Sequence, residues 1–121
     1  MPRYVSFYRY TGEAWGSMVE RPGNRAAAAR KLIESVGGTM ETFYWMLGDW
    51  DGLVIYEVPD AAAAAAFSAR VAGSGMLDAV QTNQLVSMDE AKRALDTARG
   101  AAYVPPGAQQ EWRAEYDVLG G

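Results

Sequence analysis

The chain has 121 residues, half of them hydrophobic, which is the size of one domain with one core. It contains no cysteine and no histidine, which excludes disulfide scaffolds, thiolate metal sites, histidine-ligated haem and histidine-dependent catalytic triads. A net charge of -4 and the absence of a long apolar run predict a cytoplasmic protein that binds neither nucleic acid nor a membrane.

The first part of the chain predicts a strand, a loop and a helix. Residues 4–10 alternate aromatic or β-branched side chains with a period of two, which is typical of a strand. Residues 13–23 include Gly16, Pro22 and Gly23 and predict a loop, with room for one helical turn. Asn24 is a favourable N-cap, and the helix that follows it is expected to end at the glycines 37–38.

The next part predicts a β-hairpin and two more helices. Strands over 39–47 and 53–58 are joined by a turn over 48–52. Asp60 caps a helix over 61–72, whose alanines allow it to lie close to a sheet. Residues 79–88 predict a fourth strand, and Ser87 with Glu90 forms a capping box for a last helix that ends at Gly100.

This order of elements, βαββαβ followed by a helix, predicts an α+β fold of the ferredoxin-like type with both main helices on one face of the sheet. We expect the domain to span residues 2–99 and a C-terminal arm to span 100–121. The arm carries Trp112, Tyr116 and Leu119 at helical spacing, so it is expected to dock on a surface.

The predicted strands have two unlike faces. The almost entirely apolar face is expected to pack under the helices, and it consists of Val5, Phe7, Phe43, Trp45, Leu47, Leu53 and Ile55. The other face holds five of the seven tyrosines, and its members are Tyr4, Ser6, Tyr8, Tyr10, Met40, Thr42, Tyr44, Met46, Val54, Tyr56 and Val58. Since so large an aromatic face is rarely left in water, a second copy is expected to cover it, which predicts a dimeric α+β barrel.

Several segments together resemble the GYD-domain family of small bacterial proteins. They include residues 29–38, the hairpin Tyr44-Trp45-Met46-Leu47-Gly48-Asp49-Trp50-Asp51 and residues 57–67. The resemblance covers about residues 2–93 and implies a dimeric α+β barrel; related barrels include cofactor-free oxygenases, isomerases, dehydratases and haem enzymes. The chain departs from the family pattern at Trp50, where the family usually has a tyrosine.

Two groups of residues are candidates for a site. Tyr44, Asp49 and Asp51 are predicted to be catalytic, because a phenol and two carboxylates near a pocket mouth can move protons. The predicted ligand-binding residues are Tyr8, Tyr10, Thr42, Trp50 and Tyr56. The alternatives are that the aspartates only bond the turn backbone and that the tyrosines fill a packed dimer core.

These observations predict a barrel that binds a small apolar or aromatic molecule, and a cofactor-independent enzyme acting on such a molecule is one form of this prediction. Neither a metal nor a cofactor is expected, and the expected partners are a second copy and the ligand. The alternative is a non-catalytic assembly or regulatory module that uses the C-terminal arm.

Overall fold

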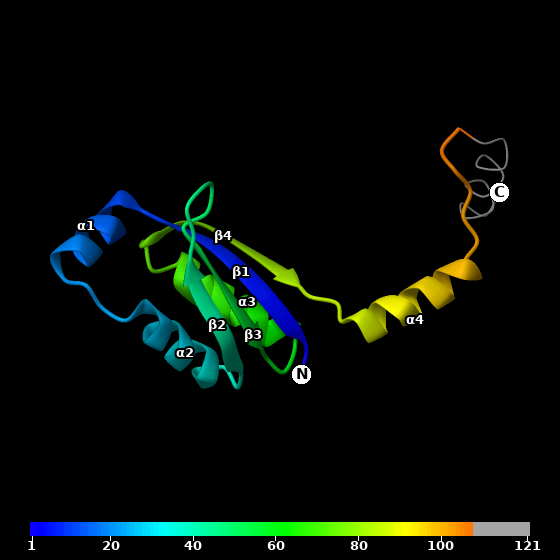
Figure 1. The fold of residues 1–121 in the computed structure, drawn as a ribbon, viewed down its shortest axis with the longest axis horizontal. Helices are drawn as coiled ribbons and strands as arrows, with labels where there is room; N and C mark the ends of the chain where they lie inside the picture. The colour runs from blue at the N-terminus through cyan, green and yellow to red at the C-terminus, as the bar shows by residue number, and fades with distance from the viewer. Residues whose placement is uncertain (108–121) are drawn as a thin grey trace. The chain divides into compact units, whose positions relative to one another are not determined.

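The computed structural model describes residues 1–107 of the chain (Figure 1). In chain order the elements are β1 (Arg3–Tyr10), α1 (Gly12–Glu20), α2 (Arg25–Ser35), β2 (Thr39–Trp45), β3 (Gly52–Glu57), α3 (Ala61–Ala72), β4 (Leu77–Gln84) and α4 (Met88–Arg99). The chain divides into two compact units, of which the first is Met1–Val86 and the second begins at Ser87. A domain boundary after residue 99 stays a prediction, and Trp112, Tyr116 and Leu119 lie outside the described residues.

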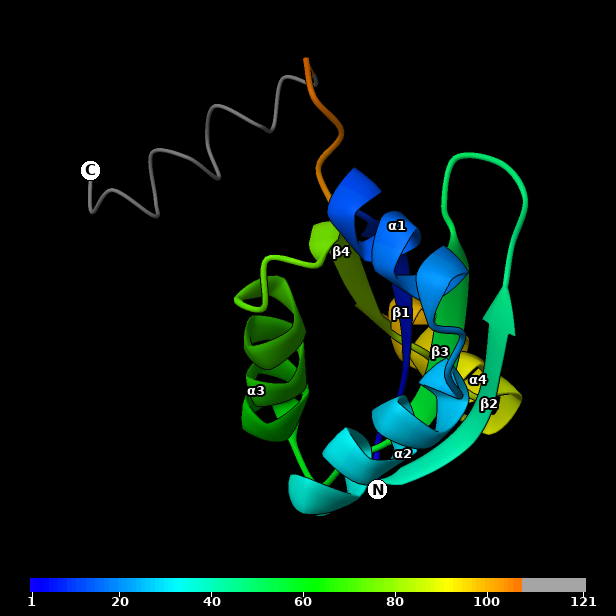
Figure 2. The same ribbon diagram turned by 90° about the vertical axis from the view of Figure 1, so that its left-hand side faces the viewer.

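The four strands form one sheet in the order β2-β3-β1-β4, with every neighbouring pair antiparallel. Helices α2 and α3 lie over the same face of this sheet (Figure 2). This is the ferredoxin-like α+β fold that the order of elements predicted. Among the described residues, no helix is long and apolar enough to span a membrane.

The predicted helix caps are confirmed. The side chains of Asn24 and Asp60 accept hydrogen bonds from the amides of Ala27 (3.0 Å) and Ala63 (2.9 Å). Ser87 and Glu90 form the reciprocal capping box of α4. These contacts join residues three apart in the sequence, so local chemistry is enough to set where the three helices begin.

The loop predicted over 13–23 is wrong in part, because α1 occupies most of it. Thr11 caps this helix by accepting a hydrogen bond from the amide of Ala14 at 3.1 Å. Trp15 then packs edge-on against Tyr10 and Trp45, with ring centroids 5.2 and 5.3 Å away. These tertiary contacts offset the weak helix propensity of the glycines in the segment.

The assignment of the two sheet faces is also wrong, because the tyrosine face is the one under the helices. The buried core cluster consists of Tyr4, Ile33, Met40, Val54, Tyr56, Val58, Ala64 and Phe67. Tyr56 is completely buried, with its ring 5.9 Å from Tyr4 and 4.9 Å from Phe67. The helices above are rich in alanine, so large rings on the sheet fill the space that the small helix side chains leave.

A bulge in β2 separates residues that the alternation had grouped. Met40 lies opposite Tyr56, but Thr42 lies opposite Ile55, so the extra residue between them is Glu41. Beyond the bulge the faces are exchanged: Phe43 stacks on Tyr8 at 5.4 Å under the helices, and Tyr44 lies opposite Leu53. The single tyrosine cluster predicted from alternation therefore does not form, because Tyr44 is on the other face.

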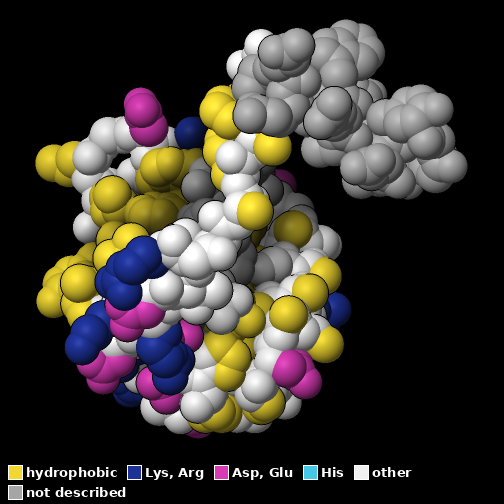
Figure 3. All heavy atoms as spheres, turned by 90° about the vertical axis from the view of Figure 1, so that its right-hand side faces the viewer, with side chains coloured by type: hydrophobic (Ala, Val, Ile, Leu, Met, Phe, Trp, Pro, Cys, Tyr) yellow, Lys and Arg dark blue, Asp and Glu magenta, His cyan; other side chains and the backbone are white. Residues whose placement is uncertain are grey.

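The opposite face of the sheet has no helix of residues 1–86 over it. We call this side of the sheet the open face; its apolar centre consists of the half-buried residues Phe7, Leu53 and Ile55 and of Val5, which is already buried in one copy. Figure 3 views the molecule from the side opposite to Figure 2, and hydrophobic side chains there gather in a patch beside intermixed basic and acidic ones. Arg3 bridges Glu41 and Glu57 at 3.3 and 3.6 Å.

Candidate ligand-binding cleft

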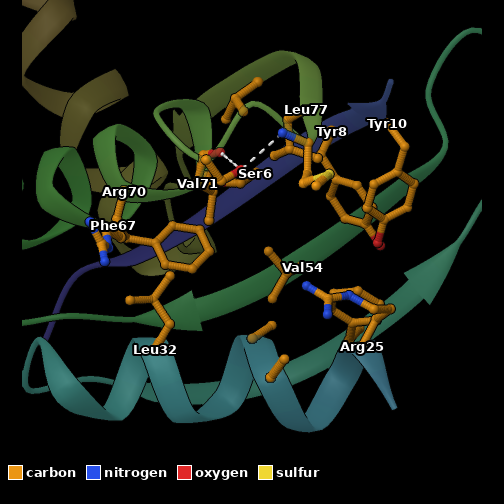
Figure 4. A pocket seen from close by; sticks show the side chains of 16 residues that line it. Ser6, Tyr8, Tyr10, Arg25, Leu32, Val54, Phe67, Arg70, Val71 and Leu77 are labelled. Atoms are coloured by element: carbon orange, nitrogen blue, oxygen red, sulfur yellow. Dashed lines mark hydrogen bonds between the residues drawn. The ribbon is translucent and has the colours of Figure 1, made fainter. Parts of the chain in front are cut away.

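A cleft of about 420 Å³ lies between the sheet and helices α2 and α3 (Figure 4). Strands β1, β2, β3 and β4 supply its floor, and the two helices and the segment after α3 supply its walls. Its lining residues are Ser6, Tyr8, Tyr10, Arg25, Ala28, Ala29, Leu32, Phe43, Val54, Phe67, Arg70, Val71, Ser74, Met76, Leu77 and Val80. A volume of this size with mostly apolar walls is typical of small-molecule sites.

The cleft exists because the helices present small residues where they cross the sheet. Ala28 and Ala29 lie on one turn of α2 that forms part of the wall, and Leu32 lines the same wall one turn later. On the α3 side, Phe67 and Val71 lie one turn apart and face the cleft. Alanines thus leave space near the N-terminal half of α2, while larger side chains seal the other end.

The polar groups beneath the cleft are satisfied by one another. The Ser6 hydroxyl bonds the hydroxyls of Tyr56 and Thr82, both at 2.8 Å, and Thr82 also bonds Ser68 of α3 at 2.8 Å. Within the described part of the chain, every buried side-chain nitrogen or oxygen has a partner. Burial is the main reason that the pKa of Tyr56 is raised, so its phenol stays protonated within this network.

The phenol of Tyr8 lies directly against the backbone of Gly52. A Cβ atom at Gly52 would overlap the Tyr8 phenol, so only glycine fits under this ring. The Tyr8 hydroxyl donates to the carbonyl of Tyr44 at 3.3 Å. Burial, with the neighbouring Tyr10 as the next cause, raises the pKa of Tyr8, so its hydroxyl is a neutral donor at physiological pH.

An aromatic cluster adjoins the cleft at Tyr10. The rings of Tyr10, Trp15 and Trp45 meet edge to face, with centroids 5.2 to 6.4 Å apart. Trp45 is half exposed, so this cluster lies between the cleft and solvent. The rings of Trp15 and Trp45 therefore both contact Tyr10 at the edge of the cleft.

Comparison with known families identifies this fold. The family model described as the GYD domain matches residues 4–95, which is most of the chain. The chain belongs to the GYD-domain family. The match covers all the elements that build the cleft, and it confirms the resemblance that the hairpin and its flanking segments indicated.

Other comparisons add little about this GYD domain. A search of curated proteins found no match. One similar solved structure is the protein Atu4242 from Agrobacterium tumefaciens, with 13% sequence identity and a TM-score of 0.42. The alignment covers 74% of this chain and 97% of that one.

The GYD domain brings only part of the predicted site together. Tyr8 and Tyr10 line the cleft, and Tyr56 lies beneath it, bonded to Ser6. Thr42 and Tyr44 lie outside the cleft lining, on the other face of the sheet, where Tyr44 is 64% exposed. Their predicted roles in binding and catalysis stay predictions.

The hairpin residues of the GYD domain also lie outside the cleft lining. The Asp51 carboxylate accepts a hydrogen bond from the amide of Tyr10 at 2.8 Å, which ties the hairpin to β1. Arg9 donates to the backbone carbonyl of Asp49 at 2.9 Å, and its guanidinium lies 4.9 Å from the ring centre of Trp50. In addition, Trp50 packs against Phe7 at 6.0 Å. These contacts favour structural roles, although the Asp51 carboxylate bonds the backbone of β1 and not that of its own turn.

Replacing Asp51 by alanine is expected to lower the free energy of unfolding by about 1.5–3 kcal/mol, because the Tyr10 amide loses a charged acceptor. Asp49→Ala is the matched control, since the Asp49 side chain has no hydrogen bond among residues 1–107 and we expect a change within about 0.5 kcal/mol. Urea denaturation measures both. Equal losses in the two variants would contradict the structural role of Asp51.

Alternation along the strands did not reveal the helix residues of the cleft. Arg25, Leu32, Phe67 and Arg70 come from α2 and α3, far from β1 in the sequence. Helical spacing marked Leu32 as apolar, but nothing local shows which strand it faces. In the described residues, no group of three acidic side chains is placed to hold a metal ion.

Proposed function

We propose that this GYD domain binds a small, largely apolar molecule in the cleft between its sheet and helices α2 and α3. The observation that supports this most directly is a space of about 420 Å³ lined by Leu32, Phe43, Phe67 and Val71. Such a space favours a ligand that removes apolar surface from water. Tyr10 offers a hydroxyl group to orient the ligand, while the Tyr8 hydroxyl is already bonded to the Tyr44 carbonyl and contributes its ring to the lining.

Binding, rather than catalysis, is the function that we propose. Tyr44, Asp49 and Asp51 lie outside the cleft lining, so catalysis by them in this cleft would need a different arrangement. Their catalytic role therefore stays a prediction from the sequence.

Filling the cleft tests the proposal. Ala28 lies on the α2 wall and is exposed, so Ala28→Phe places a ring at the cleft without burying it in the core. We expect this variant to weaken the binding of naphthalene-2-carboxamide and naphthalene-2-carboxylate by about tenfold or more. Ala27→Phe is the control, because Ala27 is the preceding exposed residue of α2 and lies outside the lining.

Isothermal titration calorimetry measures both probes against wild type and the two variants. Saturable binding of at least one probe, lost in Ala28→Phe and kept in Ala27→Phe, supports the function. If neither probe binds, or if both variants behave alike, the cleft is not the binding site.

We further propose that two copies pair through the open face. Val5, Phe7, Leu53 and Ile55 make this face apolar, and a second sheet is the simplest surface to cover it. The sequence predicted such pairing through the tyrosine face, whose buried residues now form the core of one copy.

Ile55→Glu is expected to convert a dimer to a monomer, because it places an unpaired charge in the proposed interface. Ala65→Glu, on the exposed surface of α3, adds the same charge and should leave the dimer intact. Sedimentation equilibrium at micromolar concentration distinguishes the two states. A monomeric wild type, or an Ile55→Glu variant that is still a dimer, would contradict the proposed pairing.

A further inference from the structure

The charge of the cleft is opposite to that of the chain. The whole chain carries 15 acidic and 11 basic side chains. Among the described residues that line the cleft, Arg25 and Arg70 are basic and none is acidic. The potential inside therefore favours an anion, although the net charge of the protein is negative.

Neither arginine is neutralised by an acidic side chain of the part of the chain that the structure describes. Within residues 1–107 the ion pairs involve Arg3, Arg9 and Arg99, and neither Arg25 nor Arg70 forms one. Both guanidinium groups belong to exposed residues beside apolar walls. A planar guanidinium in this setting suits a carboxylate, which it can bind through two parallel hydrogen bonds.

The two arginines differ in their surroundings. Arg25 and Arg70 lie on opposite sides of the cleft, and the rings of Tyr8 and Tyr10 run toward Arg25 (Figure 4). Burial raises the pKa of Tyr8, so its phenol brings no negative charge to the cleft, but its proton is donated to the Tyr44 carbonyl and Tyr10 is the phenol left to meet an anion. Arg25 thus has two phenol side chains near it, whereas Phe67 lies beside Arg70.

We propose that the ligand is an apolar carboxylic acid whose carboxylate is held by Arg25 beside the Tyr10 hydroxyl, with its hydrocarbon body against Leu32, Val54 and Phe67. This inference rests on the proposed binding function and names the chemical class of its ligand. At about 30 Å³ for each water-sized group, 420 Å³ holds on the order of 14 non-hydrogen atoms. Both a two-ring aromatic acid and a medium-chain fatty acid fit this size.

The test compares a charged probe with a neutral one of the same shape. In calorimetry, wild type is expected to bind naphthalene-2-carboxylate at least about tenfold more tightly than naphthalene-2-carboxamide. Decanoate, titrated in parallel, distinguishes the two kinds of carboxylic acid that fit the cleft. Tighter binding of decanoate indicates a fatty acid, and tighter binding of naphthalene-2-carboxylate indicates an aromatic acid. Either result supports a carboxylic acid.

Arg25→Gln assigns the preference to one side chain. We expect this variant to lose the preference for the carboxylate while it still binds the carboxamide. Arg30→Gln is the matched control, because Arg30 is an exposed arginine of the same helix that lies outside the cleft lining and its loss changes the net charge equally. Circular dichroism confirms that each variant is folded.

The outcomes separate this inference from the binding function. If the carboxylate and the carboxamide bind equally, the cleft binds ligands but the acid is the wrong class. If Arg25→Gln and Arg30→Gln weaken carboxylate binding equally, or if only Arg70→Gln does so, the assignment to Arg25 is overturned. If no probe binds at all, the proposed binding function itself is wrong, and the inference about the ligand falls with it.

Discussion

Replacing Tyr56 by alanine is expected to lower the free energy of unfolding by about 3–5 kcal/mol, the range for deleting a buried aromatic ring. Tyr56 is fully buried, and its ring contacts Tyr4 and Phe67. Its removal opens a cavity under α3 and takes one hydrogen-bond partner from Ser6. Tyr56→Phe keeps the ring, so we expect a loss of only about 1 kcal/mol.

Ile55→Ala is the matched comparison, because Ile55 is the adjacent residue of β3 and lies on the open face. At protein concentrations where the chain is monomeric, we expect it to lose only about 1 kcal/mol, since Ile55 is only partly buried in one copy. Urea denaturation measures all three variants. A larger loss for Ile55→Ala than for Tyr56→Ala would mean that the helices cover the opposite face of the sheet.

The protein is expected to lose stability as the pH rises above 10. Burial raises the pKa of both Tyr8 and Tyr56 above the ordinary value of 10.0 for a tyrosine. The unfolded chain therefore releases these protons first, so alkaline pH favours unfolding. Their contribution is complete below pH 10 and falls by about 1.4 kcal/mol per pH unit for each group until the folded protein also ionises.

Tyr8→Phe is expected to reduce this slope, because phenylalanine has no proton to release. Tyr103→Phe is the control, since Tyr103 is 77% exposed. Unfolding free energies from urea titrations at pH 8 to 11.5, at one protein concentration, give the slopes. A slope in Tyr8→Phe equal to that in Tyr103→Phe would contradict the assigned burial of the Tyr8 phenol.

Local sequence chemistry predicted much of the fold. The caps at Asn24, Asp60 and Ser87 lie at the observed starts of α2, α3 and α4, because a cap needs only a side chain and an amide three residues away. The positive φ of 88° at Gly37 marks the expected end of α2. The fourth strand was placed too late, since Ser87 caps α4 and β4 already ends at Gln84.

The candidate site was predicted less well than the fold. Tyr8 and Tyr10 both line the cleft, because strand alternation puts them on one face, but the cleft lies under the helices of the same copy and not against a second copy as predicted; their role in binding stays a prediction. Tyr44 was grouped with them only because the bulge at Glu41 leaves no clear mark in the sequence. One extra residue is enough to move every later side chain of β2 to the other face.

The sequence by itself determined the order of the elements, the helix starts and membership of the GYD family, because all of these depend on neighbouring residues or on local motifs. Only the tertiary structure decided which face of the sheet the helices cover. Both faces are apolar enough to be buried, and the choice depends on how the tyrosine rings fill the space under alanine-rich helices and on whether Ser6, Thr82 and Tyr56 satisfy one another. The same packing created the cleft and brought Arg25 and Arg70 to it from two helices distant in the chain.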